Sequence, residues 1–372
     1  MEKSRKYLFA LIHSGLASDE SFSAAKFAPL FGDVENRPDW NAIYKLSAAQ
    51  GVLAVAWDGL QRLIDAGVIA EDMRPSRSEM LQWVYNVQTI EDKYHRQKEV
   101  IGRLAKLYSS AGIDMMVLKG YGLSLCYPVP EHRPCGDIDI WLYGCQKQAD
   151  DLLRNRGIKV DEDVHHHTVF HLAGIMIENH FDFLNVHAHV SNRGLEKILQ
   201  EQVKVEHESV PVGDGRVKLP PANFNALFLL RHSASHFAAE KIGLRHLTDW
   251  ALFVERYGDE IDWTWLERVA REYNMHRFLY CLQYAAAECS GMDIRRFHDF
   301  GVDKLAGRVL NDVLFPEFSE QKPAGFIKLN IYKCRRWWAN RWKHNIVYRE
   351  SLFATFFQQL YSHLLKPKTF TH

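Results

Sequence analysis

The chain has 372 residues, of which 47% are hydrophobic and 25% are charged. This composition is typical of a globular protein of about two or three domains, and it argues against a wholly disordered or collagen-like chain. The 46 basic residues balance the 46 acidic ones, which argues against a uniformly basic nucleic-acid coat protein. Six scattered cysteines without a CxxC pair favour a reduced compartment, and no apolar run approaches the roughly 18 residues of a membrane span. We therefore expect a cytoplasmic protein.

The first region, residues 1–98, is predicted to be helical. Apolar residues recur at helical spacing from Ile43 to Leu63, with a break at Gly51. A further helix is predicted from Ser76 to about Tyr108, because apolar side chains recur there at steps of three and four residues. These patterns indicate a helical N-terminal region that ends near residue 98.

The second region, residues 99–221, is predicted to be mixed α/β. Short apolar runs or alternation of polar and apolar residues predict strands at 114–118, 137–142, 166–172 and 174–182. Helices are predicted between some of these strands, at 121–127 and 147–156. A pair of prolines, Pro220 and Pro221, marks the expected end of this region.

The third region, residues 222–372, is predicted to be helical again. One helix is expected to begin near Phe224 and another to run from Leu244 to Tyr257. Asp262 is a candidate N-cap for a third. Arg245 and Asp249 have the spacing of an ion pair within one helix.

The last part of this region forms a basic, aromatic tail. From Lys322 to His372 there are ten Lys and Arg residues against one acidic residue, and three tryptophans lie among them. Basic residues interleaved with aromatic ones can bind RNA or an anionic membrane surface. An apolar helical face from Ile346 to Leu364 favours another interpretation, in which the tail packs on the more acidic remainder of the chain.

The pair Asp137 and Asp139 is the first candidate for chemistry. Residues two apart on a strand point to the same face, so this strand presents two carboxylates side by side. Like charges this close repel unless a cation lies between them, and oxygen ligands suit Mg²⁺ or Mn²⁺. A solvated strand face is the alternative interpretation, and we favour the metal site.

A glycine-containing turn precedes this strand in the sequence. Lys119 and Gly120 follow the buried strand that ends at Leu118, and a short helix is predicted after them. Backbone N–H groups at such a turn can bind phosphate. A phosphate-binding turn beside paired carboxylates is the apparatus of phosphoryl or nucleotidyl transfer.

In this arrangement the sequence resembles the DNA polymerase β-like nucleotidyltransferase superfamily. More narrowly, it resembles the uncharacterised bacterial nucleotidyltransferase family labelled NTP_transf_5, over roughly residues 30–290. The resemblance is carried by Leu118-Lys119-Gly120, Tyr127-Pro128, Arg133, Asp137-Ile138-Asp139, His165-His166-His167, Glu178-Asn179-His180 and Leu244-Arg245-His246-Leu247-Thr248-Asp249. It implies an α+β fold in which a small polymerase β-like α/β domain is flanked by N- and C-terminal helical regions.

The resemblance also implies a function and roles for particular residues. The function is metal-dependent transfer of a nucleoside monophosphate from an NTP to a hydroxyl acceptor, with Mg²⁺ or Mn²⁺ as cofactor. Asp137, Asp139 and Glu178 would be the catalytic residues and metal ligands, and Lys119, Gly120 and Arg133 would bind the nucleotide. Lys119-Gly120 departs from the Gly-Gly or Gly-Ser turn that is usual in the superfamily. The acceptor, which could be a small molecule, a protein or an RNA end, is not specified by the sequence, nor is the oligomeric state.

The histidines between residues 165 and 189 allow a second interpretation. Seven histidines in 25 residues suggest a zinc enzyme, but no HExxH motif is present, and we place this interpretation below nucleotidyl transfer. We expect His167 and His180, with Asp182, to line an acceptor pocket instead. Two further alternatives stay open, a non-catalytic nucleotide-binding protein and an RNA- or membrane-associated protein that uses the basic tail.

Overall fold

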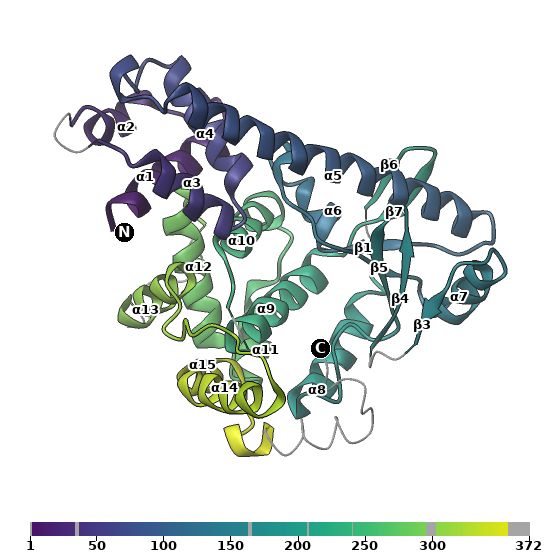
Figure 1. Cartoon of the computed structure of the whole chain (residues 1–372). Helices are drawn as coiled ribbons and strands as arrows, with labels where there is room; N and C mark the ends of the chain where they lie inside the picture. The colour runs from purple at the N-terminus through teal and green to yellow at the C-terminus, as the bar shows by residue number, and fades with distance from the viewer. Residues whose placement is uncertain are drawn as a thin grey trace.

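The structure of the chain is a computed structural model, shown in Figure 1. It describes residues 2–33, 37–162, 166–206, 208–239, 241–294 and 303–355. The elements divide into N-terminal helices, a mixed sheet and C-terminal helices (Figure 1). The predicted α+β fold with flanking helical regions is therefore confirmed.

The described residues before the first strand form five helices: α1 (Glu2–Leu16), α2 (Ala24–Phe31), α3 (Trp40–Ala49), α4 (Leu53–Asp65) and α5 (Arg77–Ser109), with a 3₁₀ turn η1 (Glu71–Met73). The helix break predicted at Gly51 is confirmed, because α3 and α4 are separate helices. α5 begins at a capping box, in which the Ser76 side chain accepts from the backbone of Glu79 and the Glu79 side chain accepts from the backbone of Ser76. This long helix continues through residue 98, where we expected the first region to end, and reaches the sheet.

Seven strands in the described chain form one sheet, in the order β3-β4-β5-β2-β1-β7-β6. Their bounds are β1 (Met116–Leu118), β2 (Ile138–Trp141), β3 (Val160–Asp161), β4 (His167–Leu172), β5 (Ile175–His180), β6 (Ser209–Val212) and β7 (Gly215–Lys218). β2 is parallel to β5 and antiparallel to β1. The four predicted strands correspond to β1, β2, β4 and β5, whereas β3, β6 and β7 were not predicted.

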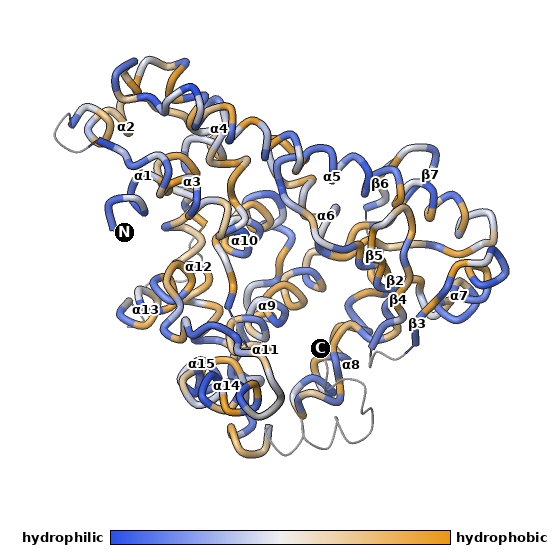
Figure 2. Tube along the Cα trace, in the orientation of Figure 1, coloured by the Kyte–Doolittle hydropathy of each residue, from blue (hydrophilic) through white to orange (hydrophobic). Residues whose placement is uncertain are grey.

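Short helices connect the strands: α6 (Gly120–Ser124), η2 (Pro130–His132), α7 (Gln146–Arg154) and α8 (Val190–Gln202). Hydrophobic residues are concentrated along the strands, whereas they alternate with hydrophilic ones along α5 (Figure 2). One core contains apolar side chains of α5, α7 and one face of the sheet, including Val117 and Ile140. Leu118 and Trp141 belong to the other core, which also contains the C-terminal helices.

The C-terminal part contains α9 (Ala222–Ala239), α10 (Leu244–Tyr257), α11 (Trp263–Glu272), α12 (His276–Ser290), α13 (Asp303–Leu314), α14 (Phe326–Ala339) and α15 (Arg341–Val347). α11 begins at the predicted cap, where the Asp262 side chain accepts from the Trp265 N–H. α12 contacts α1, and buried residues of the N- and C-terminal helices belong to a single core. The two helical regions therefore fold against each other as well as against the sheet.

Part of the basic tail lies against this helical core. Ile346 and Val347 are buried, and the Lys343 ammonium pairs with the Asp312 carboxylate at 2.5 Å in the interior. Trp338 on α14 is 55% exposed. The predicted apolar face that extends to Leu364 lies outside the described residues from position 356 onward. Among the helices that the structure describes, none has both the length and the apolar character required to cross a bilayer.

Candidate active site

Three carboxylates meet on the face of the sheet that looks toward the C-terminal helices. Asp139 lies on β2 and is 2% exposed, and Asp137 directly precedes that strand. Glu178 lies on the adjacent parallel strand β5, where its Cα is the register partner of Asp139. All three side chains line a cavity of about 720 Å³ between the sheet and the C-terminal helices. The structure therefore brings together the three predicted catalytic residues.

Two basic side chains surround the buried carboxylate of Asp139. Its Oδ1 accepts from Lys119 Nζ at 2.9 Å and lies 3.0 Å from His180 Nε2. Burial alone would raise the pKa of Asp139, but these two partners hold it well below its usual range. Burial disfavours the charged form of His180, but hydrogen bonds to Asp139 and Glu178 raise its pKa to about 9. His180 is therefore charged at neutral pH.

Asp137 lies in a different electrostatic environment from Asp139. Its pKa is raised, first by burial and second by the charge of Asp139, and Glu178 adds to the effect. Repulsion of this kind is relieved by a bound cation. Ligand atoms of Asp139, Glu178 and His180 lie within 4.8 Å of one another. A divalent cation fits this set, because two of the three groups are carboxylates.

The turn after β1 holds Lys119 in an uncommon backbone conformation. Lys119 has φ 47° and ψ −128°, a region in which glycine is readily found and other residues are strained. The next residue, Gly120, has φ 20° and also lines the cavity. Glycine at position 119 would adopt this conformation without strain. Here the Lys119 side chain reaches Asp139, and the burial that would lower its pKa is outweighed by that carboxylate, so the pKa is raised.

Arg133 is buried in the wall of the cavity with a carboxylate of its own. Its Nε and Nη2 donate to the two oxygens of Asp249 at 2.7 and 2.8 Å, and Tyr127 also donates to Asp249. Arg245, which we expected to pair with Asp249 within α10, instead donates to the carbonyl of Pro134 at 3.1 Å. No hydrogen-bonded Arg245–Asp249 pair is found among the described residues, because the turn that carries Arg133 packs against α10 and gives Asp249 a bidentate partner. The nucleotide-binding role of Arg133 stays a prediction.

Two of the three residues predicted for an acceptor pocket line the cavity. His167 and His180 are cross-strand partners on β4 and β5, and both line the cavity. Asp182 is not among the described residues that line it, and its backbone carbonyl accepts from His180 Nδ1 at 3.2 Å. Burial lowers the pKa of His166 to about 2 and that of His167 to about 3. These two rings are therefore neutral at physiological pH.

The opposite wall of the cavity comes from the C-terminal helices. His232 and His236 on α9 have ring centroids 4.4 Å apart, and both line the cavity with His246 of α10. Their spacing of four residues indicated a buried or pocket-lining pair, and this is confirmed. Tyr348, which follows α15, also lines the cavity. No local sequence signal identified Tyr348, because its position depends on how the tail folds back onto α9.

Comparison with known proteins places the chain in a sequence family. The sequence model of a family described as "Uncharacterised nucleotidyltransferase" matches residues 36–291, which is more than half of the chain. No curated protein matches the chain. Among solved structures, the crystal structure of an antigenic nucleotidyltransferase-like protein from Paracoccidioides brasiliensis matches with 14% sequence identity and a TM-score of 0.32. That match covers 47% of this chain and 85% of the other.

Proposed function

This chain belongs to the family of uncharacterised nucleotidyltransferases, and we propose that it transfers a nucleoside monophosphate from an NTP to a hydroxyl acceptor. The observation that carries the proposal is the convergence of Asp137, Asp139 and Glu178 on one cavity. Mg²⁺ or Mn²⁺ would be held by these three carboxylates. When bound, such an ion polarises phosphate oxygens and neutralises charge that develops during transfer.

The side chains around the cavity have distinct roles in this proposal. The acceptor oxygen attacks the α-phosphorus, the bond from that phosphorus to the pyrophosphate oxygen breaks, and pyrophosphate leaves. Glu178 accepts the proton of the acceptor hydroxyl, because its side chain is 18% exposed, whereas that of Asp139 is 2% exposed and already paired with two basic side chains. Lys119 provides a fixed positive charge for the triphosphate, and the turn at Gly120 allows the phosphate groups to approach the backbone.

The size of the cavity is consistent with this use. Its volume of about 720 Å³ lies within the range of roughly 300–1,000 Å³ that is typical of ligand sites. The wall opposite the carboxylates carries His232 and His246, whose pKa values are lowered by burial. It also carries aromatic rings, including Phe228 and Trp250. A nucleotide and part of an acceptor could therefore occupy the two sides of one cavity.

Binding is tested with the double variant Asp137→Asn/Asp139→Asn. We expect calorimetry to show loss of Mg²⁺-dependent NTP binding while the far-ultraviolet circular dichroism spectrum is unchanged. Asp65→Asn/Glu255→Gln is the matched control, because it also removes two carboxylates, both of them exposed and outside the cavity. Unchanged NTP affinity in the folded double variant of the cavity would refute the site assignment.

Transfer is tested by incubating the full chain with each labelled NTP and Mg²⁺ in cell extract. Mass spectrometry of the labelled product would identify the nucleotide and distinguish a small-molecule, protein or RNA acceptor. The expected result is a labelled product that is absent with Asp137→Asn/Asp139→Asn. Metal-dependent binding without any labelled product would instead indicate the alternative of a non-catalytic nucleotide-binding protein.

A further inference from the structure

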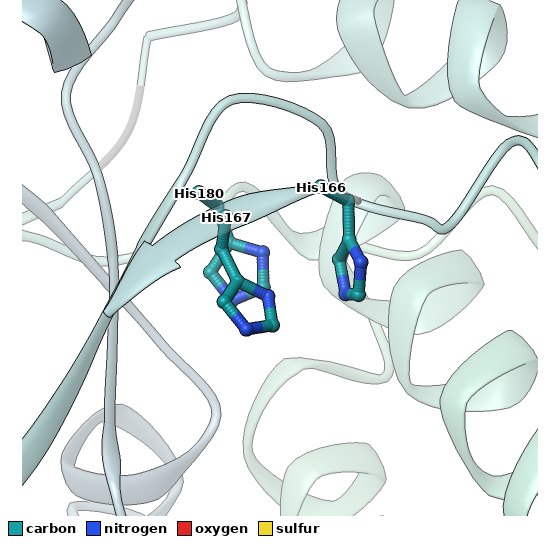
Figure 3. Close-up of side chains that lie close together, drawn as sticks. All are labelled: His166, His167 and His180. Atoms are coloured by element: carbon teal, nitrogen blue, oxygen red, sulfur yellow. The ribbon is translucent and has the colours of Figure 1, made fainter. Parts of the chain in front are cut away.

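Three histidine rings gather on the cavity wall at the end of the sheet (Figure 3). His166 directly precedes β4, His167 begins that strand and His180 ends β5. The register pairs His167 with His180, which fixes two of the rings side by side. One ligand nitrogen from each of the three rings lies within 4.8 Å of the other two.

Two of these rings carry a nitrogen that has no partner in the described structure. Nδ1 of His166 and Nδ1 of His167 are buried and make no hydrogen bond to any described residue. His167 as a whole is 7% exposed. Buried polar atoms are nearly always hydrogen-bonded, so unpaired nitrogens on two rings that line a polar cavity indicate a missing ligand.

The third ring is oriented in the way that is typical of a metal ligand. His180 Nδ1 lies 3.2 Å from the carbonyl oxygen of Asp182 and donates to it. This hydrogen bond turns Nε2 toward the carboxylates, where it lies 3.0 Å from Asp139 Oδ1 and 3.5 Å from an oxygen of Glu178. A cation bound at Nε2 would therefore take the place of the proton that this nitrogen shares with Asp139. Histidines that bind metals usually donate their second ring N–H to a carbonyl or a carboxylate, which fixes the tautomer.

We propose that His166, His167 and His180 form a nitrogen-rich site for a zinc-class transition-metal cation. The site shares Glu178 with the carboxylates proposed to hold Mg²⁺, but its other ligands are histidines in place of Asp137 and Asp139. Imidazole favours Zn²⁺, Co²⁺ or Ni²⁺, whereas carboxylates favour Mg²⁺ and Mn²⁺. Glu178 provides the fourth ligand, because one of its oxygens lies 3.5 Å from His167 Nε2 and the other lies 3.5 Å from His180 Nε2.

The rings need only a small movement to bind such a cation. A Zn–N bond of about 2.1 Å places tetrahedral ligand nitrogens roughly 3.4 Å apart. From a separation of at most 4.8 Å, each ring would shift by about 1 Å or less to reach that arrangement. A shift of this size can be made by side-chain rotation without a change in the sheet.

The test uses the metal alone, without nucleotide. The full chain is stripped with chelator and titrated with Co²⁺, whose visible absorption reports coordination by nitrogen, and Zn²⁺ is then added as a competitor. We expect one Co²⁺ per chain, displaced by Zn²⁺, and Co²⁺ affinity that falls by about tenfold or more in His166→Ala. His167→Asn is the second variant, in case His166→Ala does not fold.

The matched control is His171→Ala, which removes an exposed histidine from the same strand and should leave the Co²⁺ spectrum unchanged. Wild-type affinity in folded His166→Ala and His167→Asn would overturn the three-histidine site, as would absence of Co²⁺ binding by the wild type. Asp137→Asn separates this proposal from nucleotidyl transfer, because it should retain Co²⁺ and lose Mg²⁺–NTP binding. Each of the two proposals can therefore fail while the other holds.

Discussion

Removal of one charge from the buried ion pair between Arg133 and Asp249 is predicted to destabilise the protein strongly. Arg133 is 5% exposed and Asp249 is 7% exposed, and two hydrogen bonds of 2.7 and 2.8 Å join them. Asp249→Asn removes the negative charge but keeps the shape of the side chain. The guanidinium is then left buried without a counter-charge, so we expect a loss of about 3–5 kcal/mol in the free energy of unfolding.

An exposed pair of the same length provides the matched control. Arg37 and Asp72 are also 2.7 Å apart, but their side chains are 54% and 64% exposed. Water already solvates both charges there, so Asp72→Asn should lower the free energy of unfolding by only about 0–1 kcal/mol. The difference between the two variants isolates the effect of burial on an otherwise similar contact.

Urea denaturation followed by tryptophan fluorescence would measure both variants. A third variant, Arg133→Met/Asp249→Leu, removes both charges, and we expect it to be less destabilised than Asp249→Asn because no unpaired charge remains. A loss below about 1 kcal/mol in Asp249→Asn would refute the reasoning, since it would give the buried pair the strength of a surface pair. A double variant less stable than Asp249→Asn would contradict it as well.

Three further predictions concern other charged groups. Glu178→Gln should lower turnover by about 100-fold or more in steady-state kinetics, with little change in the NTP affinity measured by calorimetry. Turnover equal to that of the wild type would show that Glu178 is not the base. Burial disfavours the charged form of His180, but hydrogen bonds to Asp139 and Glu178 raise its pKa to about 9. The charged His180 side chain therefore stabilises the folded state fully below about pH 6.5, and this stabilisation is lost as the pH rises through 9. In chelator, the stability difference between wild type and His180→Asn should therefore shrink over that interval, and a difference that grows would contradict the assignment. Lys343→Met leaves the buried Asp312 carboxylate without a counter-charge, so chemical denaturation should show a loss of about 3–5 kcal/mol in the free energy of unfolding. A loss near zero would show that the tail contact is dispensable.

Local signals in the sequence determined many of the helices, four of the seven described strands and one half of the site. The capping box at Ser76 and the cap at Asp262 mark helix ends, because each depends only on residues three positions apart. The placement of Asp137 and Asp139 on one face likewise follows from the two-residue period of a strand. Short-range geometry of this kind is readable without knowledge of the fold.

Sheet register and helix packing decided the rest of the site. Glu178 becomes a neighbour of Asp139 only because β5 pairs with β2 in one particular register, and a shift by one residue would turn its side chain to the other face. Similarly, Asp249 lies 116 positions from Arg133 in the chain, and it binds that residue rather than the nearby Arg245. β6 and β7 were missed because their strand character depends on pairing at the edge of the sheet. Contacts between distant segments depend on the packing of all the apolar faces against one another. A local sequence pattern contains no information on that packing.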